Sequence, residues 1–276
     1  MKKIICVYFV LTLCFLIPDV SAAAQQTDEC QYNLNYLEVI DEIIYLKGSP
    51  VTGIVCKYHE NGNMEINARI VNGLPEGTVK GYYETGELEM ETPYTQGKAQ
   101  GIGRWYYKSG KLYAIIPYVN GMREGISKDY YESGALKYEI PYKNDKADGT
   151  VLTYYENGKL KGETSYKEGI EEGLSKKYYY YESGAIEDEI SYKLDKIDGI
   201  WRSYYESGKL KDETRYKNGI KEGQQKAYRE NGKPFATIEY KDGSPVSGMC
   251  HNTNGTTPLT NAELYNWENG SGIECD

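Results

Sequence analysis

The stretch from Gly149 to Glu172, GTVLTYYENGKLKGETSYKEGIEE, has the pattern of a β-hairpin. Its first run, Thr150 to Glu156, is rich in β-branched and aromatic residues, which favour strands. Asn157-Gly158 follows, and both residue types tolerate the positive φ angles of a tight hairpin turn. We therefore predict a second strand from Lys159 to about Lys167, and a further turn near Gly169.

Side chains along the second strand alternate between its two faces. Counting in twos places Leu160, Thr164 and Tyr166 on one face, and Lys161 and Glu163 on the other. This predicts one apolar or aromatic face and one charged face.

The same pattern recurs along most of the chain, which is the signature of a repeat protein. Successive units begin at Gly53, Gly77, Gly101, Gly125, Gly149, Gly173, Gly199 and Gly223, with a further start at Gly248. The unit at Gly173 contains two extra residues within Tyr178-Tyr179-Tyr180-Tyr181. An even insertion preserves strand parity, so we expect a longer strand or a local bulge there.

The aromatic composition indicates a thin structure. The chain has 30 Tyr but only 3 Phe and 3 Trp, and Tyr suits half-buried positions because its ring is apolar while its hydroxyl stays hydrated. The adjacent Tyr154 and Tyr155 must point to opposite faces. The predicted fold is all-β, an elongated single-layer antiparallel ribbon of stacked β-hairpins.

The ends of the chain differ from the repeats. Residues 1–24 have two lysines, an apolar run and then Ser21-Ala22-Ala23-Ala24, as in a cleavable signal peptide. We predict an N-terminal cap over residues 25–52, eight repeats over 53–247 and a C-terminal cap over 248–276. Loss of Lys2, Lys3 and Asp19 with the signal changes the net charge from −9 to −10.

Four cysteines remain after the signal: Cys30, Cys56, Cys250 and Cys275. Export to an oxidising compartment favours disulfides. Of the three possible connectivities we favour Cys30–Cys56 and Cys250–Cys275, because each pair lies near one end. A zinc site is disfavoured, since no Cys-x-x-Cys occurs and the only histidines are His59 and His251.

The repeat G-x-x-x-x-Y-Y-E-N-G-x-L-K-x-E-x-x-Y-K-N-G resembles the bacterial variant of the MORN repeat, found in proteins labelled YwqK-family antitoxins. The resemblance covers Gly53 to about Gly248. It departs in the first unit, where His59 replaces the second Tyr, and in the last, where Arg229 does. The resemblance implies stacked hairpins that act as a scaffold or binding surface. The antitoxin label fits poorly with an exported chain.

No catalytic group of residues emerges. His59 occupies a column that elsewhere holds Tyr, so a structural role is expected, and no nucleophile, base or metal cluster is recognisable. Glutamates before each turn recur too regularly for a paired-carboxylate site and suggest solvation instead. We predict a protein that is not an enzyme and has no cofactor.

Two columns are candidate binding surfaces. The tyrosine column contains Tyr83, Tyr107, Tyr131, Tyr155 and Tyr205, and the basic column contains Lys80, Arg104, Lys128, Lys176, Arg202 and Lys226. The competing explanation, which is the stronger, is that the tyrosines pack against one another and the basic residues keep the surface soluble.

We expect a non-catalytic exported scaffold that mediates protein–protein interaction at or outside the cell envelope, whether secreted, periplasmic or envelope-associated. The alternative is binding of the cell wall or a polysaccharide through the tyrosine column, since aromatic faces suit sugar rings. The negative charge argues against nucleic acid and membrane partners. The sequence names neither the partner nor the oligomeric state.

Overall fold

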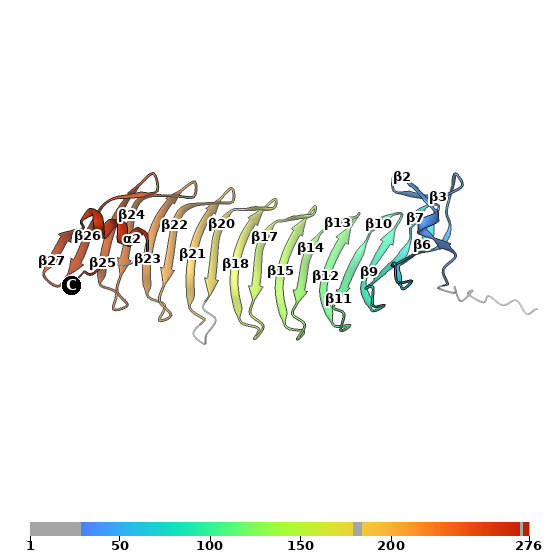
Figure 1. The fold of residues 1–276 in the computed structure, drawn as a ribbon, viewed down its shortest axis with the longest axis horizontal. Helices are drawn as coiled ribbons and strands as arrows, with labels where there is room; N and C mark the ends of the chain where they lie inside the picture. Colours follow the sequence, from blue (N-terminus) through green and yellow to red (C-terminus); the bar gives the residue numbers. More distant parts are fainter. Residues whose placement is uncertain (1–28, 179–183, 271–272, 276) are drawn as a thin grey trace, which may run out of the picture.

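The structure is a computed structural model that describes residues 29–178, 184–270 and 273–275. It is a long, open antiparallel sheet of stacked hairpins (Figure 1), which confirms the predicted all-β ribbon. The predicted signal peptide, residues 1–24, lies outside the described residues.

Each repeat unit forms one hairpin of two antiparallel strands. The hairpins are β5 (Gly53–Tyr58) with β6 (Met64–Val71), β8 (Gly77–Tyr82) with β9 (Leu88–Thr95), β11 (Gly101–Tyr106) with β12 (Leu112–Val119), β14 (Gly125–Tyr130) with β15 (Leu136–Lys143), β17 (Gly149–Tyr154) with β18 (Leu160–Lys167), β20 (Gly173–Tyr178) with β21 (Ile186–Lys193), β22 (Lys196–Tyr204) with β23 (Leu210–Lys217), and β24 (Ile220–Tyr228) with β25 (Pro234–Lys241).

Short strands join these hairpins, and other elements form the two ends. The two-residue connecting strands are β7 (Leu74–Pro75), β10 (Lys98–Ala99), β13 (Met122–Arg123), β16 (Lys146–Ala147) and β19 (Ile170–Glu171). The N-terminal end contains β1 (Tyr32–Asn33), the 3-10 helix η1 (Leu34–Tyr36), β2 (Glu38–Ile40), β3 (Ile43–Leu46) and β4 (Ser49–Pro50). The C-terminal end contains β26 (Ser244–Asn252), β27 (Gly255–Pro258) and the helix α2 (Asn261–Glu268).

A bulge near the start of each second strand changes one predicted face. In β17–β18, Thr153 pairs with Gly162, but Tyr154 pairs with Leu160, so Lys161 is an extra residue. The placement of Leu160 on the face of Tyr166 is therefore wrong, because partners across a ladder share a face and the bulge breaks the count of two. We call the side that carries Tyr166 the aromatic face, and the side that carries Tyr154 and Glu163 the charged face.

The tight-turn geometry predicted for Asn157-Gly158 is wrong. Within a unit, the Gly158 N–H donates to the Tyr155 carbonyl at 2.9 Å, and only the glycine of Asn157-Gly158 has a positive φ. Between units, both Glu168 and Gly169 have positive φ, at 52° and 85°. The tight two-residue turn thus joins successive units, and a wider turn with one left-handed glycine closes each hairpin.

The two-residue insertion leaves the strands unchanged. β20 and β21 have the same lengths as β17 and β18, and Gly173 still pairs with Tyr192 as Gly149 pairs with Tyr166. The extra residues therefore fall between the strands and not within them. Residues 179–183 themselves lie outside the described residues.

Fully buried side chains gather at the two ends of the ribbon. At the N-terminal end, Val55, Ala68, Ile70 and Val79 form a cluster against which Tyr94 packs. At the C-terminal end, a second cluster joins α2 to the sheet and includes Ile238, Tyr240, Cys250 and Leu264. Because Ile70 and Tyr240 occupy the same repeat position as Tyr166, both ends of the aromatic face are covered.

One of the two favoured cysteine pairs is bonded. Cys250 and Cys275 form a disulfide with a Cα–Cα distance of 5.4 Å, which ties the C-terminal residues to β26. Cys30 and Cys56 are free thiols in the structure. They lie close together, since the Cys30 side chain and burial together raise the pKa of the Cys56 thiol to about 12, burial being the larger cause.

Candidate binding surface

The tyrosine column links each unit to the next. The hydroxyl of Tyr107 donates to the carbonyl of Tyr130 at 2.7 Å, and the hydroxyl of Tyr131 donates to the carbonyl of Tyr154 at 2.9 Å. Tyr83, Tyr155 and Tyr205 make the same hydrogen bond to the carbonyls of Tyr106, Tyr178 and Tyr228. The hydroxyls of the column are therefore occupied within the ribbon, and only the rings remain open to a ligand.

The two units that lack this tyrosine keep the link by other means. The Nε2 atom of His59 lies 2.9 Å from the carbonyl oxygen of Tyr82, which is the structural role expected of this histidine. Arg229 donates to the carbonyls of His251 and Cys275 at 3.0 and 2.8 Å. Its longer side chain thus holds both the next strand and the disulfide-bonded C-terminal segment.

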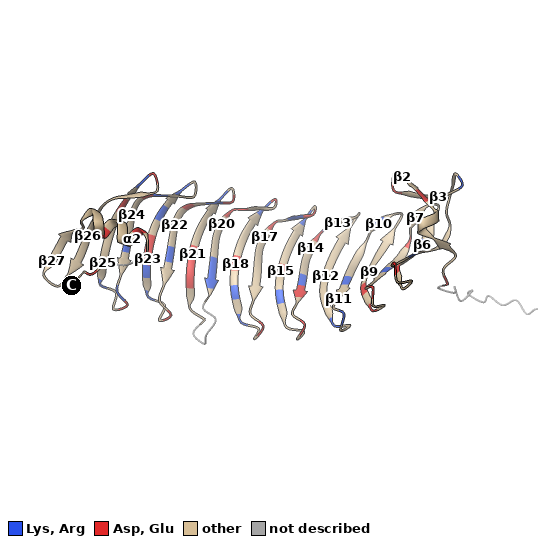
Figure 2. Cartoon of the chain, viewed as in Figure 1, with Lys and Arg blue, Asp and Glu red and all other residues tan. Residues whose placement is uncertain are grey.

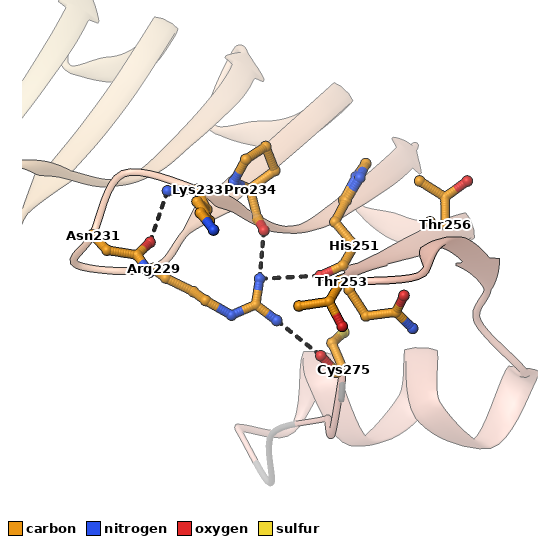
Figure 3. Close-up of a pocket in the computed structure, with 10 residues that line it drawn as sticks. Arg229, Asn231, Lys233, Pro234, His251, Thr253, Thr256 and Cys275 are labelled. Atoms are coloured by element: carbon orange, nitrogen blue, oxygen red, sulfur yellow. Dashed lines mark hydrogen bonds between the residues drawn. The ribbon is translucent and has the colours of Figure 1, made fainter.

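A hollow at the C-terminal end surrounds this arginine (Figure 3). It has a volume of about 850 Å³, and its lining includes Arg229, Lys233, His251 and Thr256. The guanidinium of Arg229 points to backbone carbonyls, as Figure 3 shows, and also lies over the ring of Phe235 at 5.0 Å. The arginine is therefore engaged in holding the end of the chain.

The basic column alternates with carboxylates along the charged face. Lys128 lies 2.9 Å from Glu139, Arg202 lies 2.9 Å from Glu213, and longer ion pairs join Arg104 to Glu91 and Lys176 to Glu163. Lys80 and Lys226 stand opposite Glu91 and Thr237 in the same ladder. Figure 2 shows both signs of charge distributed along the ribbon.

Three of these carboxylates, and Glu189 in the same column, also accept a hydrogen bond from a tyrosine of the following unit. The hydroxyls of Tyr106, Tyr154, Tyr178 and Tyr204 donate to Glu91, Glu139, Glu163 and Glu189. The hydrogen bond from Lys128, followed by that from Tyr154, lowers the pKa of Glu139. Burial, followed by the hydrogen bond to Glu163, raises the pKa of Tyr178 to about 12. The basic column is thus part of an ionic and hydrogen-bonded zipper that connects the units.

A third ladder, which the sequence analysis missed, connects the tight turns. The Asp148 carboxylate accepts the backbone N–H of Glu168 at 3.2 Å, and Glu124 accepts that of Asn144 at 3.0 Å. The same contact recurs from Glu76, Gln100, Glu172, Asp198 and Glu222. The sequence does contain a pattern that could have predicted this ladder, because an acidic residue or Gln immediately precedes nearly every unit-starting glycine.

The aromatic face between the two ends is the surface that these ladders leave open. Tyr118, Tyr142, Tyr166, Tyr192 and Tyr216 are half-buried along it. Trp105 lies against Tyr118 with ring centroids 6.3 Å apart, and Trp201 lies against Tyr216 at 5.9 Å. The sequence showed this tyrosine column as a periodic slot but did not mark it as a site.

Comparison with known proteins identifies the repeat. The sequence matches the MORN repeat variant over residues 75–96, 99–120, 123–144, 147–168, 197–218 and 221–242. The chain is a MORN-repeat protein. MORN repeats are a non-enzymatic family, generally associated with scaffolds that bind proteins or membranes. The units at Gly53 and Gly173, which depart from the pattern by substitution and by insertion, lie outside the matched segments.

The other comparisons add little. No curated protein matches the chain. A solved structure described as TcdB2-TccC3-Cdc42 is 12% identical, covering 81% of this chain and 16% of that longer chain. Its TM-score is 0.18, which carries no argument about fold or function.

The described residues contain no group of three or more His, Cys, Asp or Glu side chains placed to hold a metal ion. Within the same ranges, no helix has the length and apolar character needed to cross a membrane.

Proposed function

We propose that this chain is an exported, non-catalytic scaffold that binds a protein partner along the aromatic face between its two caps, at or outside the cell envelope. The signal-like residues 1–24 and the Cys250–Cys275 disulfide support export. The tyrosine and basic columns named from the sequence bond the units to one another. They therefore fix the positions of the side chains on the proposed binding surface.

The observation that carries the proposal is the contrast in burial along one face. Ile70 and Tyr240, at the two ends of the same column, are 1% and 2% exposed within the end clusters, whereas no described residue from 128 to 213 is buried. Half-exposed rings and aliphatic side chains such as Ile116, Ile140 and Ile190 continue between them. An extended row of this kind presents a surface that grows with repeat number, which suits a protein ligand.

The test is affinity capture from an envelope extract with the whole oxidised chain and two matched variants. Ile140 and Ile126 lie on the same hairpin but on opposite faces, because Ile140 pairs with Ser127 and Ile126 with Pro141. Ile140→Glu places a charge on the aromatic face, and Ile126→Glu, at a position 55% exposed, places one on the charged face.

A partner captured by the wild type and by Ile126→Glu, but lost with Ile140→Glu, supports the proposal. Circular dichroism and thermal melting of both variants check that the ribbon remains folded. Equal capture by both variants, or equal loss, contradicts an interaction through the aromatic face.

The second candidate function is binding of the cell wall or a polysaccharide. The paired rings Trp105–Tyr118 and Trp201–Tyr216 favour it, because adjacent aromatic faces can stack on sugar rings. Co-sedimentation with purified wall material or polysaccharide, with Trp105→Ala and Trp201→Ala as variants, tests it. Retention on the wall that depends on these rings, together with no captured protein, would replace the protein-binding proposal.

A further inference from the structure

Two tight turns differ from the others by having aspartate at their second position. These are Asn144-Asp145 and Leu194-Asp195, whereas the corresponding residue is glycine at 97, 121, 169, 219 and 243. The two aspartates have the same backbone geometry. The N–H of Asp145 donates to the carbonyl of Arg123, and that of Asp195 donates to the carbonyl of Glu171, both at 3.1 Å.

Each aspartate side chain returns a hydrogen bond to the same neighbour. The Oδ1 atom of Asp145 accepts the backbone N–H of Arg123 at 2.9 Å, and Oδ1 of Asp195 accepts that of Glu171 at 2.7 Å. Arg123 and Glu171 pair with Tyr118 and Tyr166 in equivalent registers. The same local structure thus occurs at both turns. The residue whose backbone bonds to the aspartate is Arg123 at the first turn and Glu171 at the second.

The first place contains a complete guanidinium site made by the chain itself. The guanidinium of Arg123 lies over the ring of Tyr142, 4.1 Å from its centroid. Its Nε donates to Asp145 Oδ1 at 3.2 Å, and its NH2 group donates to the Asp145 carbonyl at 2.8 Å. A cation over the ring recurs at the C-terminal end, where Lys221 lies 4.6 Å from the centroid of Tyr240.

The second place has the ring and the carboxylate of this site without its cation. Tyr192 stands where Tyr142 stands, and Glu171 is half-buried between Tyr166 and Tyr192. Burial, followed by repulsion from Asp195, raises the pKa of the Glu171 carboxyl. Among the described residues, no basic side chain forms an ion pair with Glu171 or Asp195, and none lies over the Tyr192 ring. Two neighbouring carboxylates beside aromatic rings therefore lack the positive charge that the equivalent place supplies.

We propose that Tyr192, Glu171 and Asp195 form a receptor for an arginine side chain of the protein partner. The proposal rests on the proposed function and specifies the partner's chemistry. A guanidinium can stack on the tyrosine ring and offer its planar fork to the two carboxylates, as Arg123 does internally. Lysine fits less well, because its ammonium is a strongly hydrated point charge that cannot stack in this way.

The test uses the whole chain and two probes, acetyl-arginine amide and a peptide of alternating glycine and arginine. In heteronuclear NMR, acetyl-arginine amide should shift the signals of Glu171, Tyr192 and Asp195, and should lower the pKa of the Glu171 carboxyl. The Gly/Arg peptide should bind more tightly than a Gly/Lys peptide of equal length.

Two variants and one control separate the site from general attraction to a negative chain. Glu171→Arg supplies the missing guanidinium internally, as at Arg123, and Glu171→Gln removes the charge while keeping the size. Each should weaken binding of the Gly/Arg peptide by about tenfold, the loss expected for one desolvated cation–π and ionic contact. Glu168→Gln, an equal change of charge on the exposed turn nearby, should leave the affinity almost unchanged.

Unchanged binding in both Glu171 variants, or an equal loss in Glu168→Gln, overturns the arginine receptor. Capture of the protein partner distinguishes this failure from failure of the proposed function. If Glu171→Arg still captures the partner while Ile140→Glu does not, the aromatic face is the interaction surface and the partner's arginine is not part of it.

Discussion

The ends and the middle of this ribbon are stabilised in different ways, although they are built from the same repeat. At the ends, side chains such as Ile70 and Ile238 are almost completely buried under the caps. Between residues 128 and 213, no described side chain is buried, and the units are joined by the tyrosine column, the ionic zipper and the turn contacts. A single-layer sheet can thus remain ordered without a core where repeated hydrogen bonds and ion pairs join neighbouring units.

The largest expected effect is the loss of a buried side chain at one end. Ile238→Ala should lower the local free energy of unfolding by about 3 kcal/mol, because the residue is fully buried in the C-terminal cluster. Ile140→Ala in the middle should lower it by about 1 kcal/mol, since that side chain is half-exposed. Hydrogen exchange resolved by segment measures both, and equal effects would remove the distinction between ends and middle.

Breaking the disulfide should affect the C-terminal end alone. Replacement of Cys250 and Cys275 by serine should destabilise the packing of α2 and β26 by about 3 kcal/mol, the value for a loop of this length. Amide exchange in α2 should rise, while that in β14–β18 should stay unchanged, because units contact only their neighbours. Increased exchange throughout the ribbon would mean that it unfolds as one unit.

In the middle, removal of one tyrosine hydroxyl should have a smaller and strictly local effect. Tyr131→Phe leaves the carbonyl of Tyr154 without its donor, and should cost about 1 kcal/mol at the contact between β14–β15 and β17–β18. Tyr138→Phe is the matched control, since that hydroxyl makes no hydrogen bond to the described residues. If amide hydrogen exchange at this contact is the same in the two variants, the tyrosine column does not join the units.

The smallest effect is expected from alkaline pH. Burial and the hydrogen bond to Glu189 raise the pKa of Tyr204 to about 12, and Tyr178 is raised to the same value. A raised folded-state pKa contributes stability below the unfolded value near 10, and this contribution is lost as the pH rises toward 12. Tyrosine absorbance at 295 nm should show a late-titrating group, and Tyr204→Phe should reduce its amplitude. Titration of all tyrosines near pH 10 would contradict the zipper.

Much of the fold follows from local pattern. The unit starts, the strand runs and the adjacent tyrosines that point to opposite faces were all predictable, because a period of two and a 24-residue repeat are properties of neighbouring residues. The local pattern gave wrong predictions where one bulged residue interrupts the alternation of side chains between the two faces of a strand. The bulge at Lys161 places Leu160 on the charged face. The tight-turn geometry predicted for Asn157-Gly158 occurs instead at Glu168-Gly169.

The candidate site was predicted less well than the fold. The two columns named from the sequence are real columns in space, but their hydroxyl and ionic groups bond to the next unit, which composition alone does not reveal. The turn-capping ladder could have been found from the acidic residue before each glycine. The open stretch of aromatic face could not, because it depends on where the caps end.

By itself, the sequence determined an all-β array of hairpins with tyrosine on both faces, since repeat period and strand alternation are encoded locally. Only the tertiary structure decided which side chains bond to a neighbouring unit and which remain accessible to a ligand. Tyr131 and Tyr166 are both recurrent tyrosines in the sequence, but the hydroxyl of Tyr131 donates to a carbonyl of the next unit, whereas Tyr166 lies half-buried beside Glu171. That difference arises from contacts between residues more than twenty positions apart, and these exist only when the units stack.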